Sequence, residues 1–244
     1  MTSPSVESST LREPPRKFFM SLRDIFFWVR SAQADAALAN FQQQHKPQAA
    51  FDLLYEGTPD PFGVTLPYYR YQHLKYDTLI SLLPNRPYVS ALDLGCGLGL
   101  FTRQLSEYVD QVLGVELSQV AVEQAQRLSK EHANVSFQQA NILDLNQTIK
   151  GRFDLVVLAD VLYYLSPLSD EVLKFIAQVV KDLLEPGGIL LLVNHFFFGF
   201  DTDSKLTRQI HDSFRWTPSL NLLSEHQYPF YLVSLLEKSA AIEE

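Results

Sequence analysis

The feature that most constrains the fold of this chain is a glycine-rich turn between an apolar run and a helical pattern. The stretch reads ALDLGCGLGLFTRQL, and Gly95, Gly97 and Gly99 stand at alternate positions within it. Glycine adopts backbone angles that other residues avoid, and it lets a ligand approach the backbone closely. A strand, a glycine turn and a helix in this order predict the first unit of a doubly wound α/β sheet, with a ligand site at the turn.

The segments after this turn continue the same rhythm. Apolar runs predict strands at Ala91–Leu94, Gln111–Glu116, Val135–Gln139, Leu155–Ala159 and Ile189–Asn194. Helical patterns predict helices at Tyr69–Leu83, Leu100–Tyr108, Ser118–Glu131, Glu171–Leu184 and Ser204–Phe214, with Ser118 and Ser169 as N-caps. Alternation of strand and helix is typical of a parallel sheet with helices on both faces.

Two extended runs at the end of the chain break the alternation. Leu220–His226 and Phe230–Glu237 are separated by a tight turn, and no helix fits between them. Such a pair predicts an antiparallel hairpin beside the parallel strands. The predicted fold class is therefore α/β: a Rossmann-like, doubly wound, mostly parallel seven-stranded sheet with a C-terminal antiparallel hairpin and an N-terminal helical cap.

The first third of the chain precedes this sheet. Residues 1–15 are predicted to be a disordered tail, residues 16–68 a helical and aromatic cap, and residues 69–244 the α/β domain. A helix is predicted from Lys17 to Gln44, with one broad apolar face formed by Phe18, Phe19, Leu22, Ile25, Phe26 and Val29. This face is interpreted as packing against the main domain, and contact with a membrane surface stays as the alternative.

Composition restricts the partners and the compartment. The net charge is −8, and no run of basic residues is present, which argues against nucleic acid and, weakly, for a small or neutral substrate. The single cysteine, Cys96, fits a reducing compartment, and neither a signal peptide nor a membrane span is evident, so we expect a cytoplasmic protein without stable membrane insertion. The oligomeric state stays open.

Acidic residues beside the turn sharpen the ligand prediction. Asp93 lies in the strand just before the turn, and Glu116 ends the next strand, where a carboxylate can accept both hydroxyls of a ribose. The spacing G-x-G-x-G differs from the G-x-G-x-x-G of dehydrogenases. An NAD(P)-dependent oxidoreductase is therefore disfavoured, and a non-catalytic cofactor-binding or scaffold protein remains as a second alternative.

Five stretches together resemble the class I S-adenosylmethionine-dependent methyltransferases. They are LDLGCGLG, VLGVELS, VSFQQANIL, FDLVVLADVLYYL and LEPGGILLLV. The resemblance implies S-adenosyl-L-methionine as cofactor and no metal, and it implies methyl transfer to an N or O atom of a small molecule. The cofactor-binding residues that it implies are Asp93, Gly95, Gly97, Gly99, Glu116, Leu117, Asn141, Ile142 and Asp160, where Asn141 replaces the family's usual adenine-binding acid.

Within that family, DPFG, YRYQHLKYDTLISLLP and DVLYYL look most like the small-molecule methyltransferases related to nodulation protein S, which N-methylate an amino sugar. Phe62 stands where that group has Trp, and Gln72 stands where it has Glu. The acceptor is left as an amino sugar, a sugar or another metabolite. The aromatic residues Tyr55, Phe62, Tyr68 and Tyr69 are predicted to help the cap cover the acceptor pocket.

Catalytic candidates follow the ends of the fourth and fifth predicted strands. Asp160 and His195 can take a proton from an acceptor, and Tyr163 lies just beyond Asp160. Asp160 is also a candidate N-cap or contact to the cofactor's amino group, and His195 is also a candidate core residue. Because Tyr163 and Tyr164 are adjacent, we expect at most one to face the ligand.

One further pair comes from the helix before the sheet. Tyr71 and Lys75 share a face of that helix, which is interpreted as a lid over the methionyl end of the cofactor, and a solvated charged face is the alternative.

Overall fold

The computed structural model describes residues 22–66, 69–165 and 168–240. The α-helices are α1 Leu22–Gln44, α2 Pro47–Gly57, α3 Arg70–Leu82, α4 Leu100–Leu105, α5 Gln119–Leu128, α6 Leu145–Thr148, α7 Asp170–Leu183 and α8 Thr202–Arg215. The strands are β1 Tyr88–Leu94, β2 Val109–Glu116, β3 Val135–Gln139, β4 Phe153–Ala159, β5 Leu184–Phe196, β6 Leu220–Tyr228 and β7 Phe230–Lys238. Two 3₁₀ turns, η1 Ile142–Asp144 and η2 Leu162–Tyr164, follow β3 and β4. The predicted tail and the aromatic residues Phe18, Phe19 and Tyr68 lie outside the described residues.

The strands form one seven-stranded sheet in the order β3-β2-β1-β4-β5-β7-β6. The strands β1 to β5 pair in parallel, while β7 runs antiparallel to both β5 and β6. The predicted fold class is confirmed, including the C-terminal hairpin. Ser118 and Ser169 cap α5 and α7 as predicted, because their side chains accept hydrogen bonds from the backbone N–H groups of Ala121 and Val172.

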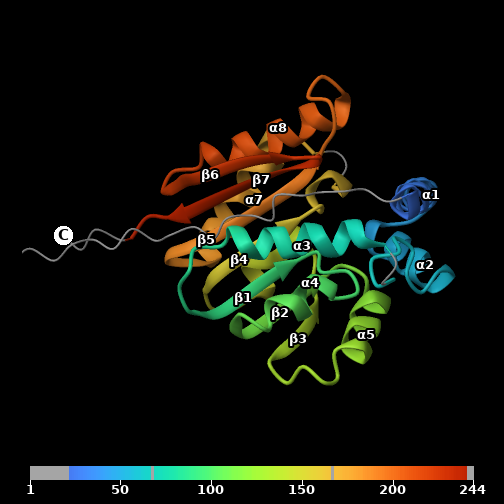
Figure 1. Cartoon of the computed structure of the whole chain (residues 1–244), viewed down its shortest axis with the longest axis horizontal. Helices are drawn as coiled ribbons and strands as arrows, with labels where there is room; N and C mark the ends of the chain where they lie inside the picture. Colours follow the sequence, from blue (N-terminus) through green and yellow to red (C-terminus); the bar gives the residue numbers. More distant parts are fainter. Residues whose placement is uncertain (1–21, 67–68, 166–167, 241–244) are drawn as a thin grey trace, which may run out of the picture.

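Alternation along the central strands builds a core on each face of the sheet. In β4, Leu155 and Val157 pack with residues of α3 and α4, whereas Val156 and Leu158 pack with residues of α7 and α8. Successive side chains of a strand point to opposite faces, so an uninterrupted apolar strand needs cover on both. This packing fixes the carboxyl ends of β1, β2, β4 and β5 at one edge, and α1 and α2 lie beyond that edge (Figure 1).

The helix α1 turns a different face inward from the one predicted. Three apolar residues of the predicted face are at least 49% exposed: Ile25, Phe26 and Val29. Phe27 and Leu38 are buried instead, as is Asp24, whose carboxylate accepts a hydrogen bond from the backbone N–H of Tyr71 at 3.0 Å. The N-terminal half of α1 carries apolar residues on more than one side, so periodicity alone did not identify the buried stripe.

The helix α2 was not predicted. Pro47 occupies its first turn, a position where proline is tolerated, and the helix ends at Gly57. Its buried residues Ala50, Leu54 and Tyr55 face α1 and the sheet domain.

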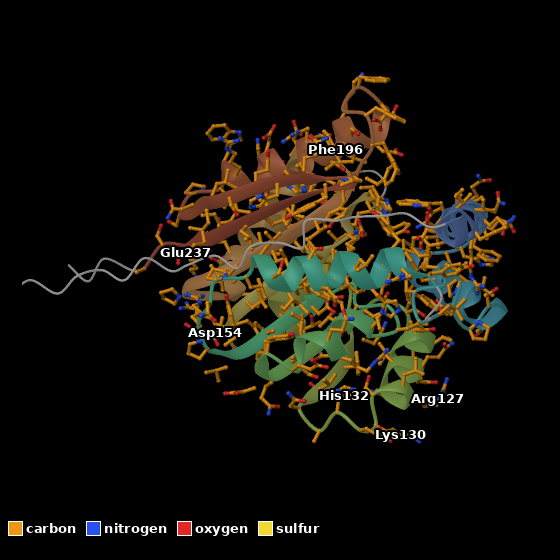
Figure 2. The ribbon with its side chains drawn as sticks, viewed as in Figure 1. Arg127, Lys130, His132, Asp154, Phe196 and Glu237 are labelled. Atoms are coloured by element: carbon orange, nitrogen blue, oxygen red, sulfur yellow. The ribbon has the colours of Figure 1, made fainter. Side chains whose placement is uncertain are left out.

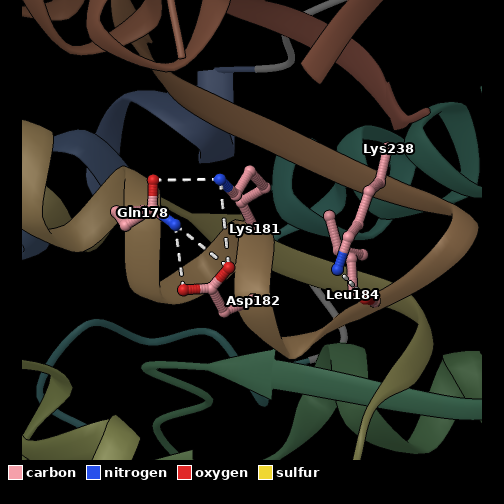
Figure 3. A network of polar contacts seen from close by, with 5 residues as sticks. All are labelled: Gln178, Lys181, Asp182, Leu184 and Lys238. Carbon is pink, nitrogen blue, oxygen red and sulfur yellow. Dashed lines mark hydrogen bonds and ion pairs between the residues drawn. The ribbon is translucent and has the colours of Figure 1, made fainter. Parts of the chain in front are cut away.

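Two groups of polar contacts lie at the opposite end of the sheet, away from α1 and α2. Near the end of α7, Gln178 donates to Asp182 at 2.9 and 3.0 Å, and Lys181 donates to Gln178 at 3.0 Å (Figure 3). The Nζ atom of Lys238 at the end of β7 donates to the carbonyl oxygen of Leu184 at 2.6 Å. None of the helices in the described ranges is long and apolar enough to cross a membrane.

Candidate active site

A cavity of about 870 Å³ lies between the carboxyl ends of the parallel strands and the helices α1 and α2. In Figure 2, Phe196 at the end of β5 marks this side of the sheet, and Asp154 at the start of β4 marks the other. The cavity wall includes residues of α1, α2 and α3, of the glycine turn, and of the segments after β2, β3, β4 and β5. Of the predicted site residues, the wall contains Gly95, Gly97, Glu116, Leu117, Asn141, Ile142, Asp160, Tyr163 and His195.

The three glycines of the turn have positive φ angles of 72°, 52° and 70°, but their surroundings differ. A Cβ atom on Gly95 would lie 2.3 Å from the side chain of Val161, and one on Gly99 would lie 2.5 Å from that of Phe137. A Cβ atom on Gly97 would meet only the hydroxyl of Tyr55, at 3.2 Å. Packing within the protein therefore requires glycine at positions 95 and 99, whereas Gly97 is the position where an added side chain would enter the cavity.

Asp93 supports the turn from behind the cavity wall. Its buried carboxylate accepts a hydrogen bond from the hydroxyl of Thr102 on α4 at 2.7 Å. Burial raises the pKa of Asp93 to about 6; the hydrogen bond from Thr102 opposes this rise and the charge of Glu116 adds to it. The carboxylate of Asp93 thus joins β1 to α4 across the glycine turn, and its predicted cofactor contact stays a prediction.

Three backbone N–H groups hold the carboxylate of Glu116 in the cavity wall. Its Oε1 atom accepts from the backbone N–H groups of Leu117 at 2.7 Å and Ser118 at 3.2 Å, and its Oε2 atom accepts from Gly97 at 3.0 Å. Burial raises the pKa of Glu116, and these backbone N–H groups oppose the rise. Because a carboxylate oxygen accepts two hydrogen bonds, Oε2 retains capacity for a ribose hydroxyl.

Asn141 and Ile142 line the cavity beside Glu116, where the turn η1 begins. The Oδ1 atom of Asn141 accepts a hydrogen bond from the backbone N–H of Leu143 at 3.0 Å. This contact fixes the side chain as the cap of η1 and leaves its amide nitrogen and the second lone pair of Oδ1 for a ligand.

At the other end of the cavity, Asp160 lines the wall and pairs with a lysine that lies behind it. Lys75 on α3 is fully buried, and its Nζ atom donates to the Oδ2 atom of Asp160. The Nε2 atom of His195 lies 3.6 Å from Oδ1 of the same carboxylate. Burial alone would raise the pKa of Asp160, but the charges of Lys75 and His195 outweigh it, so this pKa lies below its usual value. Burial lowers the pKa of His195, which keeps its imidazole neutral near pH 7.

Aromatic rings surround His195. The ring of Tyr163 stacks on the imidazole with centroids 5.3 Å apart, and the ring of Trp28 lies 5.7 Å from it. Tyr163 and Tyr164 both line the cavity, whereas their adjacency in sequence led us to expect only one. The hydroxyl of Tyr164 donates to Asp35 on α1 at 2.8 Å, which ties the cap to the segment after β4.

The face of α3 that meets the cavity is shifted by one residue from the predicted one. Gln72 and Tyr76 line the cavity, whereas Tyr71 packs against Phe27 and Trp28. Gln72 and Tyr76 are four residues apart and so share a helix face, but nothing in the sequence distinguishes their face from the adjacent one. Contacts of Tyr71 and Lys75 with the cofactor remain predictions.

Comparison with known proteins places this geometry in a family. The model of a methyltransferase domain matches residues 86–238. Nodulation protein S of Rhizobium tropici is 27% identical over 145 residues, which are 59% of this chain and 56% of that protein. Trans-aconitate 2-methyltransferase of Deinococcus radiodurans is 32% identical over 112 residues, which are 46% of this chain and 40% of that protein. The chain thus spans about half the length of these curated relatives.

A solved structure shares the fold over a larger part of the chain. The N-methyltransferase NodS of Bradyrhizobium japonicum, in complex with S-adenosyl-L-homocysteine, superposes with a TM-score of 0.59 at 18% identity, over 86% of this chain and 98% of that one. The residues found here also suit the cofactor, because Glu116 keeps a free acceptor site and Gly97 leaves space beside it. With more than half of its length matched by the family model, the chain belongs to the methyltransferase-domain family.

Proposed function

We propose that this protein transfers a methyl group from S-adenosylmethionine to a nitrogen or oxygen atom of a small-molecule acceptor. The observation that carries the proposal is the continuity of the cavity. One space of about 870 Å³ reaches from Gly97, Glu116 and Asn141 at one end to Asp160 and His195 at the other. A cofactor and an acceptor held in one cavity can be aligned for direct displacement, and such alignment can lower the barrier between two bound partners by about 7–11 kcal/mol.

The first end of the cavity is proposed to hold the cofactor. Glu116 would accept hydrogen bonds from the ribose hydroxyls, Asn141 and Ile142 would border the adenine, and the backbone of Gly97 would lie against the methionyl part. When bound, S-adenosylmethionine supplies a methyl group on a sulfonium, which is already a good leaving group. The protein therefore has to orient the acceptor, exclude water and remove a proton.

The second end is proposed to receive the acceptor. The attacking atom forms a bond to the methyl carbon while the carbon–sulfur bond breaks and its electron pair stays on sulfur. An N–H or O–H acceptor then has one proton in excess. His195 is neutral and lines the cavity, so it is suited to accept that proton. The rings of Tyr163, Phe51 and Phe62 also line the cavity and would exclude water from this end.

The same surroundings support an amino sugar or a sugar as the proposed acceptor class. The wall mixes aromatic faces with the polar groups of Gln72 and Asp60, a combination that suits sugars and amino sugars. Residues of the cap helices α1 and α2 line the cavity, which supports the prediction that residues 16–68 cover the acceptor pocket.

A turnover assay tests the proposal. Purified protein is incubated with S-adenosylmethionine and a panel of amino sugars, sugars and phenols, and each reaction is analysed by mass spectrometry. We expect one class to gain the mass of a methylene group with release of an equal amount of S-adenosylhomocysteine. Tight binding of S-adenosylmethionine with no methylated product across the panel would favour a non-catalytic, cofactor-binding protein.

A further inference from the structure

A fully buried lysine lies next to the acceptor end of the cavity but does not line it. Lys75 has no exposed surface, its Nζ atom donates to Asp160, and the ring of Tyr231 lies 5.1 Å beneath that atom. A buried ammonium group is costly unless an opposite charge is near. Asp160 supplies that charge from the end of β4.

Asp160 links this lysine to His195. Its backbone has a φ angle of 58°, which is uncommon for a residue other than glycine, and its N–H donates to the carbonyl oxygen of Val193 at 2.9 Å. These constraints direct Oδ2 toward Lys75 and leave Oδ1 at 3.6 Å from Nε2 of His195, with no hydrogen-bond partner among the described residues. The three side chains form a line from α3 through the end of β4 to the end of β5.

We propose that Lys75 is a positioning residue: by pairing with Asp160 it fixes this carboxylate beside His195 and offsets its charge, so that His195 faces the cavity as a neutral imidazole. The importance of a neutral His195 rests on the proposed function, in which this residue accepts the acceptor's proton. The electrostatic link itself does not depend on that function.

The charges around His195 show why the lysine matters. Asp160 from β4, Asp35 from α1 and Asp203 from α8 all favour the protonated imidazole. Burial opposes protonation of the imidazole. Among the charged groups described around His195, Lys75 is the cation that also opposes it. Without Lys75, the nearest carboxylate would act on the imidazole at its full charge, and the pair would take up a proton at higher pH.

The test is an NMR titration of the full-length protein without an acceptor. The imidazole signals of His195 and the carboxyl carbon of Asp160 are followed against pH in the wild type and in the variants K75M, D160N and K75M/D160N, with H195N to assign the imidazole. Circular dichroism confirms that each variant is folded. K174M on α7 removes an exposed lysine and serves as the matched control.

We expect K75M to raise the pKa of the His195–Asp160 pair by about one unit or more, the usual size of a close charge effect, and D160N to lower the pKa of His195. The pKa of His195 should be higher in K75M/D160N than in D160N, and the pKa values of K174M should match those of the wild type. If K75M does not fold, the comparison of D160N with K75M/D160N isolates the lysine in the same way. An unchanged or lowered pKa in K75M, or equal pKa values of His195 in D160N and K75M/D160N, would overturn the proposal. Such a result would leave the proposed methyl transfer open, because the turnover assay tests that separately.

Discussion

Of the three glycines of the turn, Gly95 and Gly99 are required for packing, whereas Gly97 leaves space for a ligand. An alanine substitution at each position tests this difference. All three positions have positive φ angles, so alanine costs about 1–2 kcal/mol of backbone strain at each. At Gly97 the new methyl group meets only the hydroxyl of Tyr55 at 3.2 Å. At Gly95 and Gly99 it would lie 2.3 and 2.5 Å from side chains of the core, and such overpacking costs roughly a further 1–3 kcal/mol.

These costs predict two different patterns. G97A should lower the melting temperature by about 2–8 °C, and G95A and G99A by roughly 4–20 °C, since 1 kcal/mol corresponds to about 2–4 °C in a chain of this size. G97A should nevertheless weaken binding of S-adenosylhomocysteine at least about tenfold, because its methyl group occupies the cavity. Gly97→Val should abolish binding while the protein stays folded.

The assay combines thermal unfolding with isothermal titration calorimetry on the same preparations, at a temperature where every variant is folded. The ratio of lost affinity to lost stability should be largest for G97A. Wild-type affinity in G97A, or a melting temperature lower than those of G95A and G99A, would refute the assignment of Gly97 to the ligand.

Further predictions concern the residues around the turn. E116A should weaken S-adenosylhomocysteine binding in calorimetry by about 1.5–3 kcal/mol, the value of a hydrogen bond to a charged group. The control E123A, at an exposed site on α5, should bind like the wild type. Equal affinities of E116A and the wild type would remove Glu116 from the site. S118A deletes the cap of α5 and should lower stability to chemical denaturation by about 1 kcal/mol, and no change in the unfolding midpoint would count against the cap. Burial raises the pKa of Asp93 to about 6, whereas the unfolded chain releases this proton from about pH 4. The contribution of Asp93 to the free energy of unfolding therefore falls as pH rises from about 4 to about 6, and it stays at its lower value at higher pH. D93N should remove this component, and melting curves of D93N that parallel the wild type between about pH 4 and 6 would contradict it.

The parts of the fold that the sequence predicted well are those with strong local patterns. The strand β3 was located to the residue, and the helix starts at α5 and α7 were marked by their capping serines. Long apolar strands between helices leave few alternatives to a doubly wound sheet, because both faces must be covered. The same topology then brings the ends of β1, β2, β4 and β5 together, which is why residues far apart in sequence could be assigned to one site.

The parts that were missed depend on tertiary contacts. Which side of a helix is buried depends on where the helix meets its neighbours. This contact decides that Phe27 and not Ile25 is buried in α1, and that Tyr76 and not Tyr71 lines the cavity from α3. Apolar or aromatic residues on more than one side of a helix give no single periodic signal for that choice. The pairing of Lys75 with Asp160 joins residues 85 positions apart, and no local pattern specifies it.

We propose that one cavity holds the cofactor against Glu116 and directs its sulfur toward Asp160 and His195. A crystal structure of the full-length protein with S-adenosylhomocysteine tests this most directly. We expect ribose hydroxyls within hydrogen-bond distance of the Glu116 carboxylate, the methionyl part against Gly97, and the sulfur atom facing the space beside His195. Cofactor density elsewhere on the protein, or a ribose turned away from Glu116, would contradict it.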